Sequence, residues 1–120
     1  MATIEIKDEN FRDTYQNNDV VILDFWAEWC APCHQFAPIF EELSNEITDV
    51  VFGKVNTEEE QKLSAYFGIR SIPTTLIIRE GLELFRHSGV LDAESLKGVI
   101  KQVQDADMDE IRKKIETEES

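Results

Sequence analysis

The sequence has few cysteines and no long apolar run. Its 120 residues include two cysteines, which are too few to staple a small secreted fold. No run of about 18 or more apolar residues occurs, so no segment is predicted to cross a bilayer. The first ten residues carry three acids and no long apolar stretch, and we expect no secretory signal. These absences favour a reducing compartment, and we expect a cytoplasmic protein; an exported protein whose signal has been removed is the alternative.

Positive charge is also scarce. Twelve Lys and Arg stand against 25 Asp and Glu, which gives a net charge of −13. An excess of acid would repel the phosphates of nucleic acids and the headgroups of anionic membranes, so we expect neither as a partner. The 42% of hydrophobic residues and the length together suit one domain with a buried core.

Strand and helix patterns alternate along the chain and predict an α/β fold. The clearest strand is the nearly continuous apolar run at residues 20–26, which suits a central strand buried on both faces. We expect Asp8 to cap the first helix, Thr57 and Glu60 to form a capping box for the third, and Asp92 to cap the last. The predicted order is β-α-β-α-β-α-β-β-α, with strands at 3–6, 20–26, 50–55, 74–79 and 82–87 and a long helix at 30–47.

An acidic extension follows the alternating pattern. We place the domain at residues 1–104 and the extension at residues 105–120. Met108, Ile111 and Ile115 recur at helical spacing and form a narrow apolar stripe. We predict a short surface helix or a frayed tail here, with a helix that docks a partner as the sharper alternative.

The two cysteines stand where the central strand is predicted to give way to the long helix. Cys30 lies at the helix start, where unpaired N–H groups and the helix dipole stabilise a thiolate. Cys33 lies one turn later, within reach of Cys30, and can resolve a mixed disulfide formed there. The spacing therefore predicts dithiol–disulfide exchange.

Three other interpretations of the pair are weaker. A zinc site would use Cys30, Cys33, His34 and His87, but there is no second Cys-x-x-Cys and two adjacent ligands fit one tetrahedral ion poorly. Cys-x-x-Cys-His is also a haem-attachment signature, although few residues could serve as the second axial ligand. Two ordinary core cysteines would leave the position at the helix start unexplained. We predict no metal.

Two segments resemble the thioredoxin family. Residues 24–33, Asp-Phe-Trp-Ala-Glu-Trp-Cys-Ala-Pro-Cys, resemble its active-site segment, and residues 67–74, Phe-Gly-Ile-Arg-Ser-Ile-Pro-Thr, resemble its cis-proline segment. The resemblance runs from about residue 3 to residue 103. It implies a thioredoxin fold, in which four helices flank a central mixed five-stranded sheet, and a thiol–disulfide oxidoreductase.

The resemblance also implies residue roles. Cys30 attacks the substrate disulfide and Cys33 resolves the intermediate, as the spacing had already indicated. Asp24, a buried acid whose pKa desolvation should raise, assists proton transfer, and Lys54 lies near it. The alternatives are that Asp24 is a satisfied core acid and that Lys54 is a strand-edge charge.

A substrate-binding surface follows from the same resemblance. Pro73 is preceded by a cis peptide bond, and the backbone of Ile72 pairs with an extended substrate. Trp29, Gly89 and Val90 complete an apolar collar around the first cysteine, although core packing is the alternative for Trp29.

We expect three residues to support the active site: Trp26, Ala31 and Pro32. Two positions near the cysteines depart from the family pattern. The family's usual glycine is replaced by Ala31, and its usual lysine after the second cysteine by His34. We expect only a modest shift in redox potential from these changes, and for His34 a plain surface position is the simpler interpretation.

The implied function is a dithiol carrier that reduces protein disulfides, with roles in electron transport and cell redox homeostasis. A flavoprotein thioredoxin reductase that draws on NADPH would recycle it, no cofactor would be bound to the chain, and we expect a monomer. A client-binding module and an exported oxidase or isomerase are the alternatives. Loss of function in a Cys30→Ser, Cys33→Ser double variant would separate the carrier from the binding module.

Overall fold

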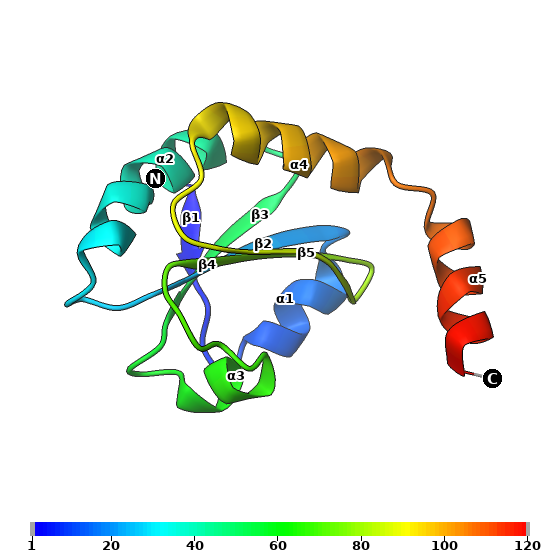
Figure 1. The fold of residues 1–120 in the computed structure, drawn as a ribbon, viewed down its shortest axis with the longest axis horizontal. Helices are drawn as coiled ribbons and strands as arrows, with labels where there is room; N and C mark the ends of the chain where they lie inside the picture. The colour runs from blue at the N-terminus through cyan, green and yellow to red at the C-terminus, as the bar shows by residue number, and fades with distance from the viewer. Residues whose placement is uncertain (1, 120) are drawn as a thin grey trace.

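The computed structural model describes residues 2–119. Five strands and five helices alternate in the order that the sequence predicts, with one helix added at the C-terminal end (Figure 1). The elements are β1 (Thr3–Glu5), α1 (Phe11–Asn17), β2 (Val20–Trp26), α2 (Ala31–Glu46), β3 (Val51–Asn56), α3 (Gln61–Tyr66), β4 (Thr74–Arg79), β5 (Leu82–Ser88), α4 (Ala93–Asp105) and α5 (Met108–Glu119). In the described part of the chain, no helix is long and apolar enough to cross a membrane.

The strands form one mixed sheet in the order β1-β3-β2-β4-β5. The first three are parallel, and β4 and β5 are antiparallel additions joined by a tight turn at Glu80 and Gly81. Both turn residues have positive φ, 51° and 80°, which is why a glycine suits the second position. The central strand, β2, carries the apolar run, and six of its seven residues are buried. The predicted mixed five-stranded α/β fold is confirmed.

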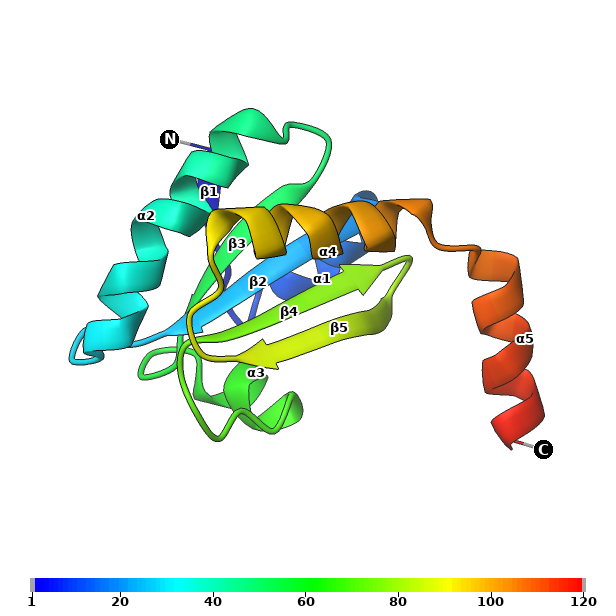
Figure 2. The same cartoon turned by 45° about the horizontal axis from the view of Figure 1, so that its top comes forward.

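Helices cover both faces of the sheet (Figures 1 and 2). One core lies under α2 and α4 and includes Ile22, Phe36, Phe40, Ile77 and Ile100. The other lies under α1 and α3. Alternate residues of β2 enter alternate cores because side chains of a strand point to opposite faces in turn. This alternation decides which side chains of the strand face α2.

Two predicted helix caps are wrong. The N-cap of α1 is Asn10, without a side-chain capping bond, and the Asp8 carboxylate instead accepts a bond of 2.9 Å from the Leu63 N–H in the first turn of α3. In return, the Asp8 N–H donates to Glu60 Oε1 at 3.1 Å. The Thr57 hydroxyl donates to the Trp26 carbonyl and caps no helix. Asp8 is thus joined to the start of α3 by two hydrogen bonds, although more than 50 residues of chain separate the partners.

The cap predicted for the last helix is confirmed. The Asp92 carboxylate accepts a bond of 2.7 Å from the Ser95 N–H and caps α4. Helix α2 continues through Pro38 to Glu46. Gly68 follows α3 with a φ of 63°, the left-handed conformation that ends helices most cheaply at glycine.

The acidic extension contains the ordered helix α5. The Arg79 guanidinium, at the end of β4, donates from one nitrogen to the carbonyls of Val103, Gln104 and Ala106, so it caps the C-terminus of α4 and the link to α5. Arg112 of α5 pairs with Glu80 at 2.7 Å in the β4–β5 turn. The extension is therefore fixed to the end of the sheet that lies far from the start of α2 (Figure 1).

Candidate active site

The cysteine pair lies where β2 ends and α2 begins. Cys30 is the N-cap of α2, and its sulfur accepts a bond of 3.2 Å from the Cys33 N–H. The two form a disulfide with 5.3 Å between their Cα atoms. Ala31 and Pro32 occupy the first helical positions, where a proline removes only an N–H that the helix leaves unpaired. Both cysteines are almost buried, with 4% and 2% exposure, so attack on the pair needs a partner that docks at its rim.

A loop from the other side of the sheet faces the disulfide. The Ile72–Pro73 peptide bond is cis. The Ile72 carbonyl oxygen lies 3.7 Å from Cys30 Sγ, and the Pro73 carbonyl accepts a bond of 2.8 Å from the Gly89 N–H. Gly89 has a φ of 106°, a conformation that L side chains rarely adopt, and the next residue, Val90, is 40% exposed. The structure thus places Ile72 beside the first cysteine, with Pro73 next in the chain and Gly89 bonded to Pro73.

The fifth collar residue, Trp29, projects into solvent. Its side chain is 71% exposed, which rules out the core-packing alternative. The indole N–H donates to Glu58 Oε1 at 2.5 Å and ties the ring to the loop after β3. A hollow of about 380 Å³ is lined by Trp29, by Ile72 and by residues of α3. The exposed ring and the hollow leave apolar surface beside the disulfide for another chain to contact.

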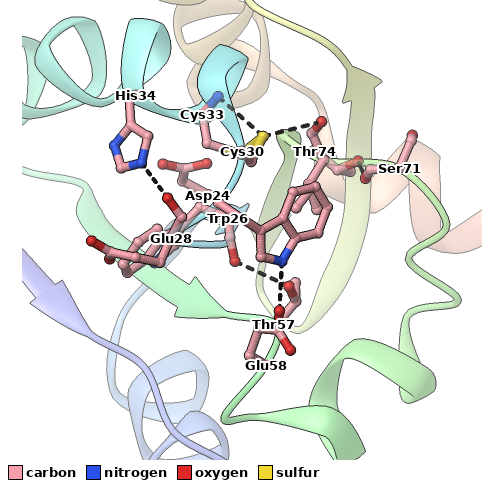
Figure 3. Close-up of a disulfide and its surroundings, with 12 residues drawn as sticks. Asp24, Trp26, Glu28, Cys30, Cys33, His34, Thr57, Glu58, Ser71 and Thr74 are labelled. Atoms are coloured by element: carbon pink, nitrogen blue, oxygen red, sulfur yellow. Dashed lines mark hydrogen bonds between the residues drawn. A yellow bond between two sulfur atoms is a disulfide. The ribbon is translucent and has the colours of Figure 1, made fainter.

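The Asp24 carboxylate is fully buried beneath the pair. Its side chain points from β2 toward the cysteines (Figure 3). Burial raises the pKa of Asp24 from 3.8 to about 7, and the nearby Lys54 ammonium, 3.9 Å from Oδ2, acts in the opposite direction. Lys54 also lies 5.0 Å from the centre of the Trp26 ring, which packs against the cysteine pair. A carboxyl with a pKa near neutrality can take up and release a proton under physiological conditions.

His34 has a defined contact that its surface position had not suggested. Its Nε2 is 2.6 Å from the Glu28 carbonyl oxygen, so the ring donates this bond (Figure 3). The bond links the first turn of α2 to the loop before Cys30. Sequence reasoning also missed Glu58 as the partner of Trp29, since nothing in the local pattern marks a residue 29 positions away as a partner.

Within residues 2–119, no group of three or more His, Cys, Asp and Glu side chains is placed to hold a metal ion. The cysteines are already bonded to each other, and His87 lies on β5, opposite Thr75 of β4. The Cys30–Cys33 disulfide can interconvert with its dithiol form by exchange with another thiol or disulfide. An α/β fold with such a pair at the start of a helix defines a thiol–disulfide oxidoreductase.

Comparison with known proteins agrees with this class. The Thioredoxin family model matches residues 2–102. A putative thioredoxin 2 of Streptomyces coelicolor is 46% identical over 95% of this chain and 85% of its own, and a thioredoxin of Haemophilus influenzae is 39% identical over 82% and 94%. The structure of a mutant thioredoxin of Halobacterium salinarum superimposes with a TM-score of 0.79 at 30% identity, over 88% of this chain and 93% of that one. The chain belongs to the thioredoxin family.

Proposed function

We propose that the protein reduces disulfide bonds of other proteins, with Cys30 as the nucleophile and Cys33 as the resolving thiol. The observation that carries this proposal is the position of Cys30 as the N-cap of α2. There the helix dipole and the Cys33 N–H, which is 3.2 Å from the sulfur, favour a thiolate in the reduced protein. Cys33 is enclosed more deeply, at 2% exposure, which suits a thiol that acts only after a mixed disulfide has formed.

The proposed exchange proceeds in two steps. The Cys30 thiolate attacks one sulfur of the substrate disulfide, so a mixed disulfide forms and the other substrate sulfur leaves as a thiolate. Cys33 then loses its proton to Asp24 and attacks Cys30 Sγ, which restores the Cys30–Cys33 disulfide and releases the second substrate thiolate. Two electrons pass to the substrate. The buried carboxylate, with a pKa of about 7, supports the role of Asp24, and Lys54 at 3.9 Å is the group that tunes it.

The proposed substrate site is the surface around the first cysteine. Trp29 and Val90 offer exposed apolar area, and Gly89 leaves the approach open. The backbone of Ile72, held by the cis bond to Pro73, is available to pair with an extended substrate segment. Apolar contact and backbone pairing depend little on the substrate's sequence, which favours contact with many proteins over recognition of one.

The proposed cycle needs an external electron source. No cofactor is required by the exchange itself, so we expect a thioredoxin reductase to return the disulfide to the dithiol with electrons from NADPH. We expect the protein to act as a monomer in the cytoplasm, where thiols are kept reduced. The bacterial relatives support this setting.

Reduction of insulin driven by dithiothreitol tests the proposal. The wild type should accelerate precipitation of the insulin B chain, and Cys30→Ser should abolish the acceleration. The matched variant Cys33→Ser keeps the nucleophile and should accumulate a mixed disulfide that mass spectrometry detects and that Cys30→Ser lacks. Equal rates for wild type and Cys30→Ser would refute the reductase function.

A further inference from the structure

A row of polar side chains crosses the apolar sheet beside the active site. In the strand registers, Lys54 of β3 lies opposite Asp24 of β2, Asp24 lies opposite Thr75 of β4, and Thr75 lies opposite His87 of β5. Directly opposed residues of neighbouring strands carry their side chains on the same face of a sheet. The four side chains therefore share one face, with the acid and the threonine adjacent at its centre.

This face is the one that α2 covers. Ile22 and Ile77, two residues from Asp24 and Thr75 along their strands, both belong to the core under α2 and α4. Because side chains two positions apart on a strand point the same way, the acid and the hydroxyl lie under the same helices. Both residues have no exposed surface. Asp24 and Thr75 thus form a closed polar spot on the face of the sheet that α2 covers.

The polar atoms of this spot have no hydrogen-bond partner among residues 2–119. This applies to both carboxylate oxygens of Asp24 and to the hydroxyl of Thr75. Buried polar groups in folded proteins are almost always bonded, either to the protein or to an ordered water. A buried water is stable where two to four polar atoms converge on it. Here Thr75 lies directly opposite Asp24 in the strand register, and the ammonium of Lys54 lies 3.9 Å from Asp24 Oδ2.

We propose that Thr75 is a positioning residue that binds the Asp24 carboxylate through one buried water and stabilises its ionised form. The inference deepens the proposed function, because it rests on Asp24 as the proton acceptor of the second exchange step. A hydroxyl accepts one bond and donates one, so Thr75 can orient the water with a hydrogen toward the carboxylate. A hydrogen bond to the charged form of an acid favours that form.

Few other charged or titratable groups of the described residues lie near Asp24 on this face. Lys54 approaches from β3 and the cysteine pair from α2. His87 flanks Thr75 on the far side of β4, and Glu5 flanks Lys54 on β1, so each is separated from Asp24 by one strand. The buried residues that α4 contributes to this core are apolar. Two residues lie directly opposite Asp24. Lys54 acts on the carboxylate by its charge, and Thr75 can act on it only by hydrogen bonding through its hydroxyl.

Two substitutions separate the hydroxyl from the volume of Thr75. Thr75→Val replaces the hydroxyl with a methyl group of similar size and keeps the β-branched shape that the strand favours. Thr75→Ser keeps the hydroxyl and removes the methyl group. The carboxyl 13C chemical shift of Asp24 in the oxidised protein, followed by NMR from pH 4 to pH 10, reports its pKa in each form; Asp24→Asn identifies the signal.

We expect Thr75→Val to raise the pKa of Asp24 by about one unit and Thr75→Ser to leave it near the wild-type value. An unchanged pKa in Thr75→Val, or equal shifts in both variants, would overturn the inference. The pH profile of insulin reduction distinguishes this failure from failure of the proposed function. If Asp24→Asn leaves that profile unchanged, Asp24 carries no proton in the reaction, while the NMR titration still decides whether Thr75 acts on the carboxylate.

Discussion

The buried Asp24 carboxyl should make the protein less stable as the pH rises, and Asp24→Asn should remove this effect. The pKa is about 7 in the folded protein, whereas the unfolded chain has the ordinary value of 3.8. Well below pH 3.8 both states are protonated, and the group has no effect on stability. As the pH rises toward 7 the unfolded state loses its proton first, so unfolding becomes progressively easier. Above pH 7 the folded state is also ionised, and the unfolding free energy decreases no further.

The size of the effect follows from the same two values. Each unit of difference in pKa corresponds to about 1.36 kcal/mol, so a shift of about three units costs the native state about 4 kcal/mol at high pH. The group is completely buried, so no solvent screening reduces this figure. Asparagine resembles the protonated acid in shape and carries no charge. The difference in unfolding free energy between variant and wild type should therefore grow by about 4 kcal/mol between pH 4 and pH 9.

Guanidinium unfolding of the oxidised proteins, at several pH values, measures this difference. The matched control is Asp13→Asn, which removes an exposed carboxylate from α1 and corrects for the change in net charge. The difference that Asp13→Asn shows from the wild type at each pH is subtracted from that of Asp24→Asn. A difference between Asp24→Asn and the wild type that is the same at pH 4 and pH 9 would show that the carboxyl titrates alike in both states, and would refute the reasoning from burial.

Three further changes have defined outcomes. Lys54→Met should raise the pKa of Asp24 above about 7, because a nearby positive charge is lost; an unchanged 13C titration would contradict this. Arg79→Met leaves three carbonyls without their donor and should lower the unfolding free energy by about 2 kcal/mol and speed amide exchange in α5; equal exchange would exclude the anchoring role. Gly53→Ala should cost about 1–3 kcal/mol in thermal unfolding, because its methyl group would overlap a buried isoleucine, whereas Gly98→Ala, with open space on α4, should cost nothing.

Features that depend on short stretches of chain are predictable from this sequence. The apolar run of β2 and the long helix α2 each depend on neighbouring residues, and each forms as predicted. The position of Cys30 at a helix start follows from the same local pattern. The family motifs extend this to the cis bond before Pro73, which no local physical rule would require.

Features that depend on pairing between distant residues are not predictable in this way. Asp8 precedes a helix and has the right chemistry to cap it, yet it caps α3 because the two segments lie side by side in the folded chain. Trp29 is held by Glu58, and Asp24 lies opposite Thr75, through contacts that only the strand order creates. A polar side chain forms a hydrogen bond with whichever partner the tertiary structure brings near it. The fold topology therefore decides the partner more than the distance along the sequence does.

The anchoring of α5 has a practical consequence. Arg79 and Arg112 fix this helix at the β4–β5 turn. Helix α2, which starts at the disulfide, begins at the opposite end of the sheet (Figures 1 and 2). A fluorophore, an affinity tag or a second protein attached beyond α5 would thus lie away from the face that clients must approach. The protein can be immobilised on a surface or fused as a carrier through this helix with its redox centre still free to turn over.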